Sequence, residues 1–458
     1  MKKNLPYDKT DPKSIEKYAQ RLIDHCLSEF LDEKKRRKLH YASNVRKKGG
    51  FGQLIEEEYF KIRPGTDKGP DFKEAGVELK TSPLKEMRDG WWSKERLVLG
   101  IINYDDIVDE TWEKSSFKRK NDLLLLIFYL YREGILIIDL IIRHARLWRI
   151  PDDDIPIIKN DWETIQEKVK KGLAHEISEG DTLYLGACTK GVTKASVRSQ
   201  PASKTKAKQR AFAFKQKYVN FILKSFLRDL GFIIKDSDRI VKDNKEYEDG
   251  KRLEQIVIDR FKPYLGRSIR DISKELQIKI DEKAKNYNDI LTKMILGVIN
   301  TRIEEFEKAD IVVKSIVLEE NGKLRESVSF PAFDYIELSK ETDWDSSALK
   351  QLFEKKFFFV IYQKNGDDSK ILKKVMFWNM PYADLNKEVK SVWKETIKRI
   401  KAGDCDNLPR ISDNRVSHVR PHGRDKRDVC MAPNGKSYTK KCFWLNAKYV
   451  RDQIGITD

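Results

Sequence analysis

The chain has 458 residues, which at roughly 150 residues per domain predicts two or three domains. Charged residues make up 36% of it, and 91 Lys and Arg against 73 Asp and Glu give a net charge of +18. Such a surplus favours a polyanionic partner, nucleic acid before an acidic membrane face. The five cysteines form no CxxC pair, which argues against a disulfide framework or zinc module and favours a reducing compartment.

The sequence shows no pattern typical of a secretory leader or a membrane span. The N-terminal residues 1–6 run into charged residues without an apolar region. The longest apolar run, Leu123–Tyr131, has nine residues, whereas a membrane helix needs about 20. No P-loop or dinucleotide-binding glycine motif is present. We therefore expect a cytoplasmic, nucleic-acid-binding protein that contacts no membrane and uses no nucleotide cofactor.

The first part of the chain alternates helical and strand patterns. The spacing of apolar residues predicts an amphipathic helix over 14–40, a second helix over Gln53–Lys61, and a strand over Gly76–Thr81. Further along, the patterns predict a strand at Arg96–Asn103, a hairpin made of Leu123–Tyr131 and Ile135–Ile142, and a helix at 161–172.

A basic segment and a polar linker follow. From Thr182 to Lys217 the chain has nine basic residues and no acidic one, a composition suited to a loop that orders on a phosphate backbone. The polar stretch Lys235–Gly250 separates the two halves, so we place the domains at 1–235 and 236–458. Beyond it, helices are predicted around 251–264 and 281–307, followed by strands and loops.

Two sequence blocks recur at long range. The block Trp112–Lys118 returns as Trp344–Lys350, and the block Phe212–Val219 returns as Phe443–Val450. The tryptophan of the first block precedes the tyrosine of the second by 106 positions in one copy and by 105 in the other. Such similar spacing predicts two tandem domains of one fold that arose by duplication.

The strongest candidate for chemistry is Asp71 followed seven positions later by Glu78, with Lys80 two further on. Side chains at positions i and i+2 of a strand share a face, so Glu78 and Lys80 point the same way. Asp71, on the turn before the strand, can converge with Glu78 on one cation. Two carboxylates around a hydrated ion suit Mg²⁺. The metal would activate a water for attack on a phosphate, and Lys80 would hold that water or the developing charge.

The Glu-x-Lys pattern by itself is common, since it occurs at Glu33, Glu78, Glu354 and Glu388. Only the copy at Glu78 follows a Pro-Asp loop and lies in an apolar strand; the others sit in charged helical patterns. From the residues alone, an edge strand with exposed charges remains the alternative to a metal-dependent nuclease site.

These motifs resemble a known family. The segments Gly52–Glu56, Pro70–Asp71, Gly76–Thr81 and Thr111–Glu113 are similar to MutH, the GATC-specific strand-nicking endonuclease of mismatch repair, in the PD-(D/E)XK nuclease superfamily. The resemblance spans roughly residues 45–225. A second domain after it resembles the Sau-type restriction endonucleases, two-domain relatives of MutH that cut both strands at GATC.

The resemblance implies roles by position. Asp71 and Glu78 would be metal ligands, Lys80 the catalytic lysine, and Glu56 the assisting acidic residue, with Glu57 or Glu58 as alternatives to it. The cofactor would be Mg²⁺, and the fold would be α/β, with two tandem restriction-endonuclease-like domains of a central mixed sheet flanked by helices. The basic side chains expected to contact DNA in the first domain are Lys118, Arg119, Lys120, Lys190, Lys194, Arg198, Arg210 and Lys215. Ala213 stands where the family has an aromatic residue.

The second domain is expected to have lost the catalytic carboxylate. When the repeats are aligned, Ile311–Ser315 falls on Val77–Thr81, so that Val312 replaces Glu78. A valine cannot bind Mg²⁺, and DNA binding would be the remaining task. One basic loop suits it, with a solvated surface as the alternative; its residues are Arg415, His418, Arg420, Arg424, Lys426 and Arg427.

The sequence therefore predicts a type II restriction endonuclease that makes Mg²⁺-dependent double-strand cuts at GATC, 5′ of the G. Its second domain would bind another copy of the site, activate the first domain and promote a DNA-induced homodimer. A MutH-like nickase and a non-catalytic DNA-binding protein are the alternatives.

Overall fold

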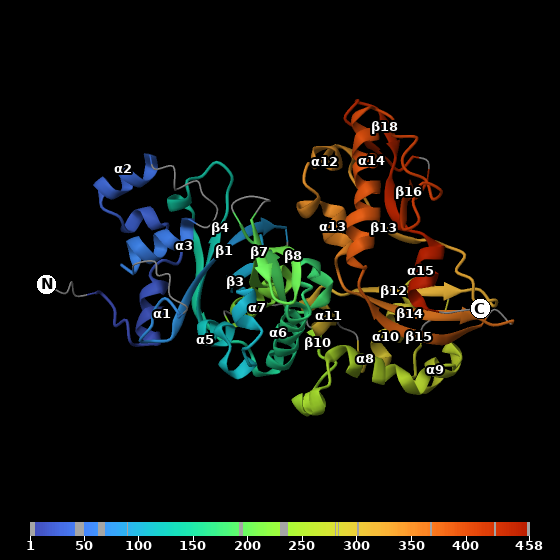
Figure 1. Cartoon of the computed structure of the whole chain (residues 1–458), viewed down its shortest axis with the longest axis horizontal. Helices are drawn as coiled ribbons and strands as arrows, with labels where there is room; N and C mark the ends of the chain where they lie inside the picture. Colours follow the sequence, from blue (N-terminus) through green and yellow to red (C-terminus); the bar gives the residue numbers. More distant parts are fainter. Residues whose placement is uncertain are drawn as a thin grey trace. The chain divides into compact units, whose positions relative to one another are not determined.

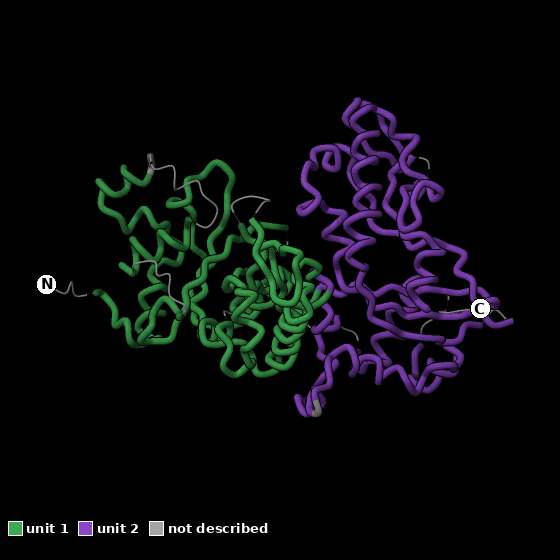
Figure 2. Tube along the Cα trace, viewed as in Figure 1, with its two compact units in different colours: residues 1–177, 181–236, 307–309 green, residues 178–180, 237–306, 310–458 purple. Residues whose placement is uncertain are grey.

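The computed structural model describes residues 5–41, 50–62, 69–88, 90–191, 196–229, 237–279, 281–282, 284–299, 302–366, 369–425 and 427–455. The chain divides into two compact units (Figures 1 and 2). Unit 1 comprises residues 1–177, 181–236 and 307–309, and unit 2 comprises residues 178–180, 237–306 and 310–458.

Unit 1 is built around a mixed sheet of order β2-β1-β4-β5. Strand β1 runs parallel to β4, whereas β2 and β5 are antiparallel to their neighbours. The inner strand β4 is almost entirely buried, as expected for a continuous apolar strand with partners on both sides. The strands of this sheet are β1 (Val77–Met87), β2 (Gly90–Ser93), β4 (Leu123–Leu130) and β5 (Ile142–Trp148).

A second sheet of unit 1 is antiparallel, with order β3-β9-β6, and a two-stranded hairpin β7–β8 lies between β6 and β9 in the chain. These strands are β3 (Leu97–Ile101), β6 (Leu185–Thr189), β7 (Val197–Gln200), β8 (Ser203–Lys208) and β9 (Arg210–Phe214). The α-helices of unit 1 are α1 (Pro12–Gln20), α2 (Glu33–Tyr41), α3 (Gly50–Leu54), α4 (Tyr104–Ile107), α5 (Ser116–Asn121), α6 (Ile155–Lys170) and α7 (Gln216–Asp229).

Unit 2 repeats this arrangement. A mixed sheet β12-β14-β15 and an antiparallel sheet β13-β19-β16 recur in the same chain order, and the hairpin β17–β18 again precedes the last strand. The strands are β10 (Ser237–Asp238), β11 (Arg302–Ile303), β12 (Val312–Leu318), β13 (Val328–Ala332), β14 (Phe357–Lys364), β15 (Lys370–Trp378), β16 (Ser417–Pro421), β17 (Val429–Met431), β18 (Ser437–Thr439) and β19 (Lys441–Leu445).

The helices in this half of the chain are α8 (Leu253–Phe261), α9 (Ile269–Glu275), α10 (Tyr287–Ile295), α11 (Glu304–Ala309), α12 (Tyr335–Lys340), α13 (Ala348–Phe353), α14 (Lys390–Lys401) and α15 (Ala447–Ile454). The last three residues of α11 group with unit 1. Each unit thus has a central mixed sheet with helices, which confirms the predicted fold class and the tandem repeat.

Several predicted boundaries are wrong. The single helix expected over 14–40 is interrupted, and its α-helical parts are α1 and α2. The interruption arises because Asp24 adopts a left-handed φ of 65°, and because Ile23 and Cys26 form β-bridges with Ile142 and Ile141 at the start of β5. The helix expected over 281–307 is likewise divided into α10 and α11. The hairpin partner of β4 is β5, beginning at Ile142, and not residues 135–142. Local apolar spacing cannot reveal such interruptions, which depend on distant pairing. Within the described ranges, no helix is long and apolar enough to cross a membrane.

Candidate active site

A tight turn brings Asp71 and Glu78 together at the start of β1. Phe72 and Val77 exchange two backbone hydrogen bonds, with N···O distances of 2.9 and 3.2 Å. The Asp71 amide then donates to Glu78 Oε2 at 3.2 Å, and the Leu79 amide donates to Asp71 Oδ2 at 2.9 Å. Two carboxylates seven positions apart in sequence are therefore held side by side.

Two lysines converge on Glu78. Its side chain is buried, with the residue only 1% exposed. Lys80 pairs with Glu78 Oε1, and Lys120 of α5 lies 3.4 Å from the same oxygen. Burial raises the pKa of Glu78, and the positive charge of Lys80 opposes that rise. The arrangement joins Asp71, Glu78 and Lys80 with a lysine from a separate helix.

Glu56 faces the same group from the preceding helix. Gly52 of α3 allows a close approach to β1, because a Cβ at this position would lie 3.2 Å from Thr81 Oγ1. The helix continues as a π-helix over Ile55–Tyr59, a geometry that occurs frequently at functional sites. Burial, followed by the negative charge of Asp71, raises the pKa of Glu56 to about 7.

The two neighbours of Glu56 are engaged elsewhere. Glu57 accepts a hydrogen bond from Gln53 at 2.8 Å, and Glu58 pairs with Lys35 at 2.7 Å. Glu56 therefore differs from its two neighbours in facing Asp71 and Lys80, a difference among three residues that the sequence does not reveal.

The donor set suits a hydrated divalent cation. Asp71 and Glu78 offer hard oxygen ligands, and burial raises the pKa values of Glu56 and Glu78, so that a nearby cation would favour their ionised forms. Among the described residues, no three His, Cys, Asp or Glu side chains are grouped to enclose a metal ion. Mg²⁺ keeps several waters and is commonly held by one or two carboxylates together with substrate phosphates. The pair therefore fits Mg²⁺.

Comparisons with known proteins point to one family. A family model described as DNA mismatch repair enzyme MutH matches residues 60–161, which include Asp71, Glu78 and Lys80. The Staphylococcus aureus protein named type II restriction enzyme Sau3AI is 37% identical over 448 residues, covering 87% of this chain and 91% of that protein. The chain belongs to the Sau3AI family of type II restriction enzymes.

The MutH likeness covers a smaller part of this restriction enzyme. The mismatch repair protein MutH of Shewanella woodyi is 31% identical over 34% of this chain and 67% of its own length. The corresponding protein of Shewanella amazonensis is 32% identical over 31% of this chain and 63% of its own. Family membership makes the chain a restriction endonuclease, a DNA-binding hydrolase, and confirms the resemblance seen in its motifs.

Strand registers identify the counterpart of the site in unit 2. A row of paired residues crosses each mixed sheet and ends on a tryptophan. In unit 1 the row is Glu78, Leu124 and Trp148; in unit 2 it is Val312, Phe357 and Trp378. Val312 therefore occupies the position of Glu78, and Lys314 occupies that of Lys80.

Lys314 has a different environment from Lys80. Its ammonium donates to the Ser329 carbonyl at 2.9 Å and lies 4.8 Å from the centre of the Phe330 ring. Burial lowers the pKa of Lys314. In the second unit of this restriction enzyme a lysine persists at the position of Lys80, but it contacts a carbonyl and a ring where Lys80 contacts a carboxylate.

The predicted DNA contacts of unit 1 divide into accessible and buried groups. Arg119, Lys190 and Arg198 are exposed, whereas Lys118 and Lys120 of α5 are half-buried. Arg198 donates to Gln209 Oε1 at 3.0 Å, and Lys194 lies outside the described residues. These positions leave α5 and the β7–β8 hairpin as basic surfaces of unit 1.

Three predicted contacts are buried. Arg210 donates to the Ala187 carbonyl at 2.7 Å, and Lys215 donates to the Thr182 carbonyl at 2.6 Å. His418 of unit 2 is 2% exposed and shares a 2.6 Å hydrogen bond with Asn446. None presents its charge to DNA in this structure, which corrects the prediction for them. Arg210 and Lys215 satisfy backbone carbonyls and His418 an asparagine side chain, and composition alone cannot distinguish these roles from phosphate contact.

The remaining basic residues of unit 2 differ in their partners. Arg415 pairs with Asp384, and Arg424 and Arg427 lie 3.8 and 3.2 Å from nearby aspartates. Lys426 lies outside the described residues. Arg420 is exposed, and its guanidinium carbon sits 4.1 Å from the centre of the Trp444 ring. Among the described arginines of this set, Arg420 is the one held by an aromatic ring and not by a carboxylate.

Trp444 is a site residue that sequence reasoning missed. It entered the sequence comparison only as part of a repeated block, yet it supports Arg420 and also meets the edge of His422 at 5.4 Å between ring centres. Trp444 takes the position of Ala213 in unit 1, since each lies one residue before the end of the equivalent strand. The signal available in the sequence was this exchange of a small residue for a large aromatic one.

Proposed function

We propose that unit 1 makes Mg²⁺-dependent double-strand cuts in DNA at GATC, 5′ of the G. The convergence of Asp71, Glu78, Lys80 and Lys120 at the start of β1 is the observation that carries the proposal. The sequence specificity and the cut position come from the likeness to the MutH and Sau-type enzymes.

Asp71 and Glu78 would hold the metal, which when bound polarises the scissile phosphate and lowers the pKa of a coordinated water. Lys80 shares an oxygen of Glu78 and is placed to orient the attacking water. Lys120 approaches from α5 and would neutralise charge on the phosphate as the bond breaks.

Glu56 would support this group from the π-helix. A carboxyl with a pKa of about 7 exchanges its proton near neutral pH, so Glu56 can hold or release a proton beside the two metal-binding carboxylates. Its role would be to keep Lys80 oriented, because that lysine influences the Glu56 pKa directly.

Unit 2 would bind a second GATC copy and activate unit 1, with no cleavage of its own. Val312 removes the metal ligand at the position of Glu78, while Arg420 on Trp444 presents a planar donor suited to bidentate contact with guanine. Two sites on one DNA, or a DNA-induced homodimer, would then provide two cuts at a palindrome.

The test is cleavage of an unmethylated linear duplex with one GATC and of one with two, with Mg²⁺ or with EDTA, for wild type and Glu78→Ala. Double-strand cuts that need Mg²⁺ and Glu78, faster on the two-site DNA, support the proposal, and sequencing of the ends gives the cut position. Nicks in one strand would indicate a MutH-like nickase. Tight binding without cleavage would contradict the enzymatic proposal.

A further inference from the structure

A row of four lysines runs along one face of α14 in unit 2. The row consists of Lys390, Lys394, Lys398 and Lys401. Spacings of four, four and three positions place successive side chains one above the other on the helix surface. Lys394, Lys398 and Lys401 are exposed, and Lys390 is half-buried. In Figure 1 the helix lies beside α12, and its buried face belongs to the core of unit 2.

The lysine row has little acidic compensation. Within the described part of the chain, its ion pairs are limited to that of Lys398 with Glu395, at 3.8 Å. Glu395 also pairs with Arg399 at 2.8 Å, so its charge is shared between two cations. Like charges three or four positions apart on a helix repel each other. The row therefore does not stabilise α14 by itself, whereas a polyanion bound along it would relieve the repulsion.

Helix α6 is the counterpart of α14 in unit 1. Trp162 of α6 packs against Trp112 with ring centres 6.0 Å apart, as Trp393 of α14 packs against Trp344 at 5.5 Å. Trp112 and Trp344 begin the two copies of the repeated sequence block. On both helices, buried residues follow the helix tryptophan at three, four and seven positions. Positions on the outer faces can therefore be matched by counting from Trp162 and Trp393.

The matching face of α6 carries mixed charges. By this count the lysine row corresponds to Lys159, Glu163, Glu167 and Lys170. Lys159 lies 3.9 Å from Glu163 and 3.5 Å from Glu113. The two lysines and two glutamates of unit 1 cancel, whereas the four lysines of unit 2 sum to +4. The lysine row is thus a property of unit 2 and not of the repeated fold.

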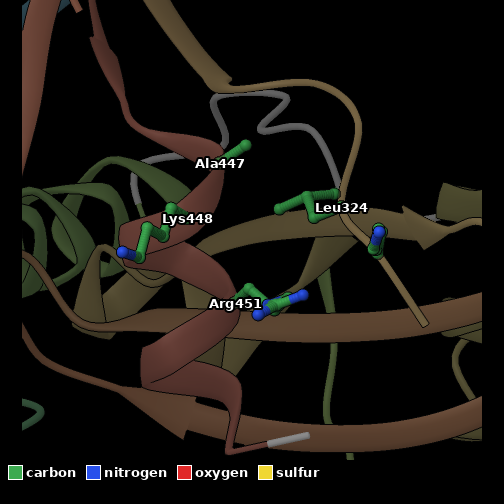
Figure 3. A pocket seen from close by; sticks show the side chains of 5 residues that line it. Leu324, Ala447, Lys448 and Arg451 are labelled. Carbon is green, nitrogen blue, oxygen red and sulfur yellow. The ribbon is translucent and has the colours of Figure 1, made fainter. Parts of the chain in front are cut away.

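The row also differs from the hollow of unit 2 that Figure 3 shows. That hollow is lined by Lys323, Leu324, Ala447, Lys448 and Arg451. The Lys448 side chain points away from it, so its cations do not converge on one small anion. The lysine row instead spans eleven positions, which is about 16 Å of helix. A line of exposed cations of that length suits an extended polyanion.

We propose that the lysine row contacts the phosphate backbone of duplex DNA. A duplex carries one phosphate charge for about every 1.7 Å of its axis, so a straight row of cations can meet several phosphates. Lysine ammonium groups are hydrated point charges that bind phosphates without reading bases. Membership of a restriction enzyme family makes DNA the polyanion that this chain meets. The contact goes beyond the proposed recognition of GATC by unit 2, because it forms on any sequence.

The experiment compares the full wild-type chain with three variants. Two of them change the row, Lys394→Gln/Lys398→Gln and Lys394→Glu/Lys398→Glu, and the second gives these positions the glutamates of unit 1. The control, Lys170→Gln/Lys171→Gln, removes two exposed cations from the end of α6. Circular dichroism checks that each variant is folded.

Affinity is measured for two duplexes of equal length, one with a GATC site and one without. Fluorescence anisotropy in EDTA at several salt concentrations gives the slope of log affinity against log salt. Flotation with vesicles of phosphatidylglycerol and phosphatidylcholine measures binding to an anionic membrane. Cleavage of a one-site duplex, which depends on Glu78, reports the proposed nuclease function separately.

We expect the glutamine variant to bind both duplexes more weakly than wild type. Its salt slope should be lower by about 1.8, since each lost phosphate contact removes about 0.9. The glutamate variant should bind more weakly still, and the control should match wild type. A slope unchanged in the glutamine variant would overturn the inference. So would a loss confined to the GATC duplex, which would indicate base recognition, or unchanged DNA binding with a loss of vesicle binding, which would indicate a membrane partner.

Discussion

The two units of this restriction enzyme pair equivalent residues across their mixed sheets and have a lysine at the same position, Lys80 and Lys314. Of the two described lysines, Lys80 pairs with a carboxylate and Lys314 with a carbonyl. Glu78 is held by Asp71 and two ammonium groups, whereas Val312 leaves Lys314 to bind a carbonyl. The cost of burying a charge explains the difference: once the carboxylate is gone, a buried lysine needs another acceptor. The comparison shows how the loss of one carboxylate changes the partner of a lysine in a duplicated domain while the strand pairing is kept.

A second pair of sites distinguishes the units by burial. In unit 1, Tyr218 and Lys308 both donate to Asp154, and the side chains of Lys308 and Asp154 are 4% and 2% exposed. The copy in unit 2 consists of Tyr449, Asp384 and Arg415. Its arginine side chain is 60% exposed. The same tyrosine–aspartate pair is therefore neutralised by a buried cation in one unit and by a solvated one in the other.

The largest effect is expected on the cleavage rate, from a change at Glu78. Glu78→Gln should lower the cleavage rate by about 10³-fold or more, since it removes a metal ligand and the partner of Lys80. The matched change Val312→Ala should leave the rate on a one-site duplex unchanged. Single-turnover cleavage in Mg²⁺ measures both rates, and equal losses in the two variants would contradict the assignment of the metal ligand to the position of Glu78 alone.

The second-largest effect is expected on the stability of the fold, from changes at the cation beside the buried Asp154. Lys308→Met leaves Asp154 without its cation in a dry environment, so we expect a loss of about 3–5 kcal/mol of stability. Arg415→Met removes a solvated partner and should cost about 0–1 kcal/mol. Urea unfolding of both variants tests the difference, and a larger loss for Arg415→Met would contradict the comparison of burial.

Arg420 should have a smaller effect, confined to DNA binding. Arg420→Lys removes the planar fork and should cost about 1–3 kcal/mol in binding of a GATC duplex. Arg424→Lys, at an arginine beside Asp428, is the matched control and should change binding by less than about 0.5 kcal/mol. Anisotropy titrations measure the binding of each variant to a GATC duplex and to a scrambled duplex. Equal losses of affinity for both duplexes would show that Arg420 does not recognise bases.

The smallest effect concerns the pH dependence of stability. The folded pKa of Glu56 is about 7, above the ordinary value of 4.5, so the folded state binds the extra proton between these values. Its ionisation therefore lowers stability as the pH rises from about 4.5 to 7. In EDTA, Glu56→Gln should raise the melting temperature at pH 8 relative to wild type and have no stabilising effect at pH 4. If Glu56→Gln stabilised the protein more at pH 4 than at pH 8, the predicted direction of the pH dependence would be wrong.

Part of the site could be read from the sequence because it is local. The order Asp71, Glu78, Lys80 lies within one turn and one strand, where the alternation of a strand dictates which side chains share a face. The repeat could be detected because apolar strands and tryptophans in the core tolerate little change. The burial of Arg210, Lys215 and His418 could not be predicted, because a basic residue in or beside a strand has the same sequence pattern whether it meets a phosphate, a backbone carbonyl or an asparagine side chain.

The sequence by itself determined the two carboxylates, their lysine, the tandem repeat and the replacement of Glu78 by Val312. Only the tertiary structure brought Lys120 to Glu78, turned Glu56 and not its neighbours toward Asp71 and Lys80, and placed Lys308 on Asp154 across 154 positions of chain. The reason is physical: alternation along a strand is set by neighbouring residues, whereas the partner of a buried charge is set by whichever distant segment packs against it.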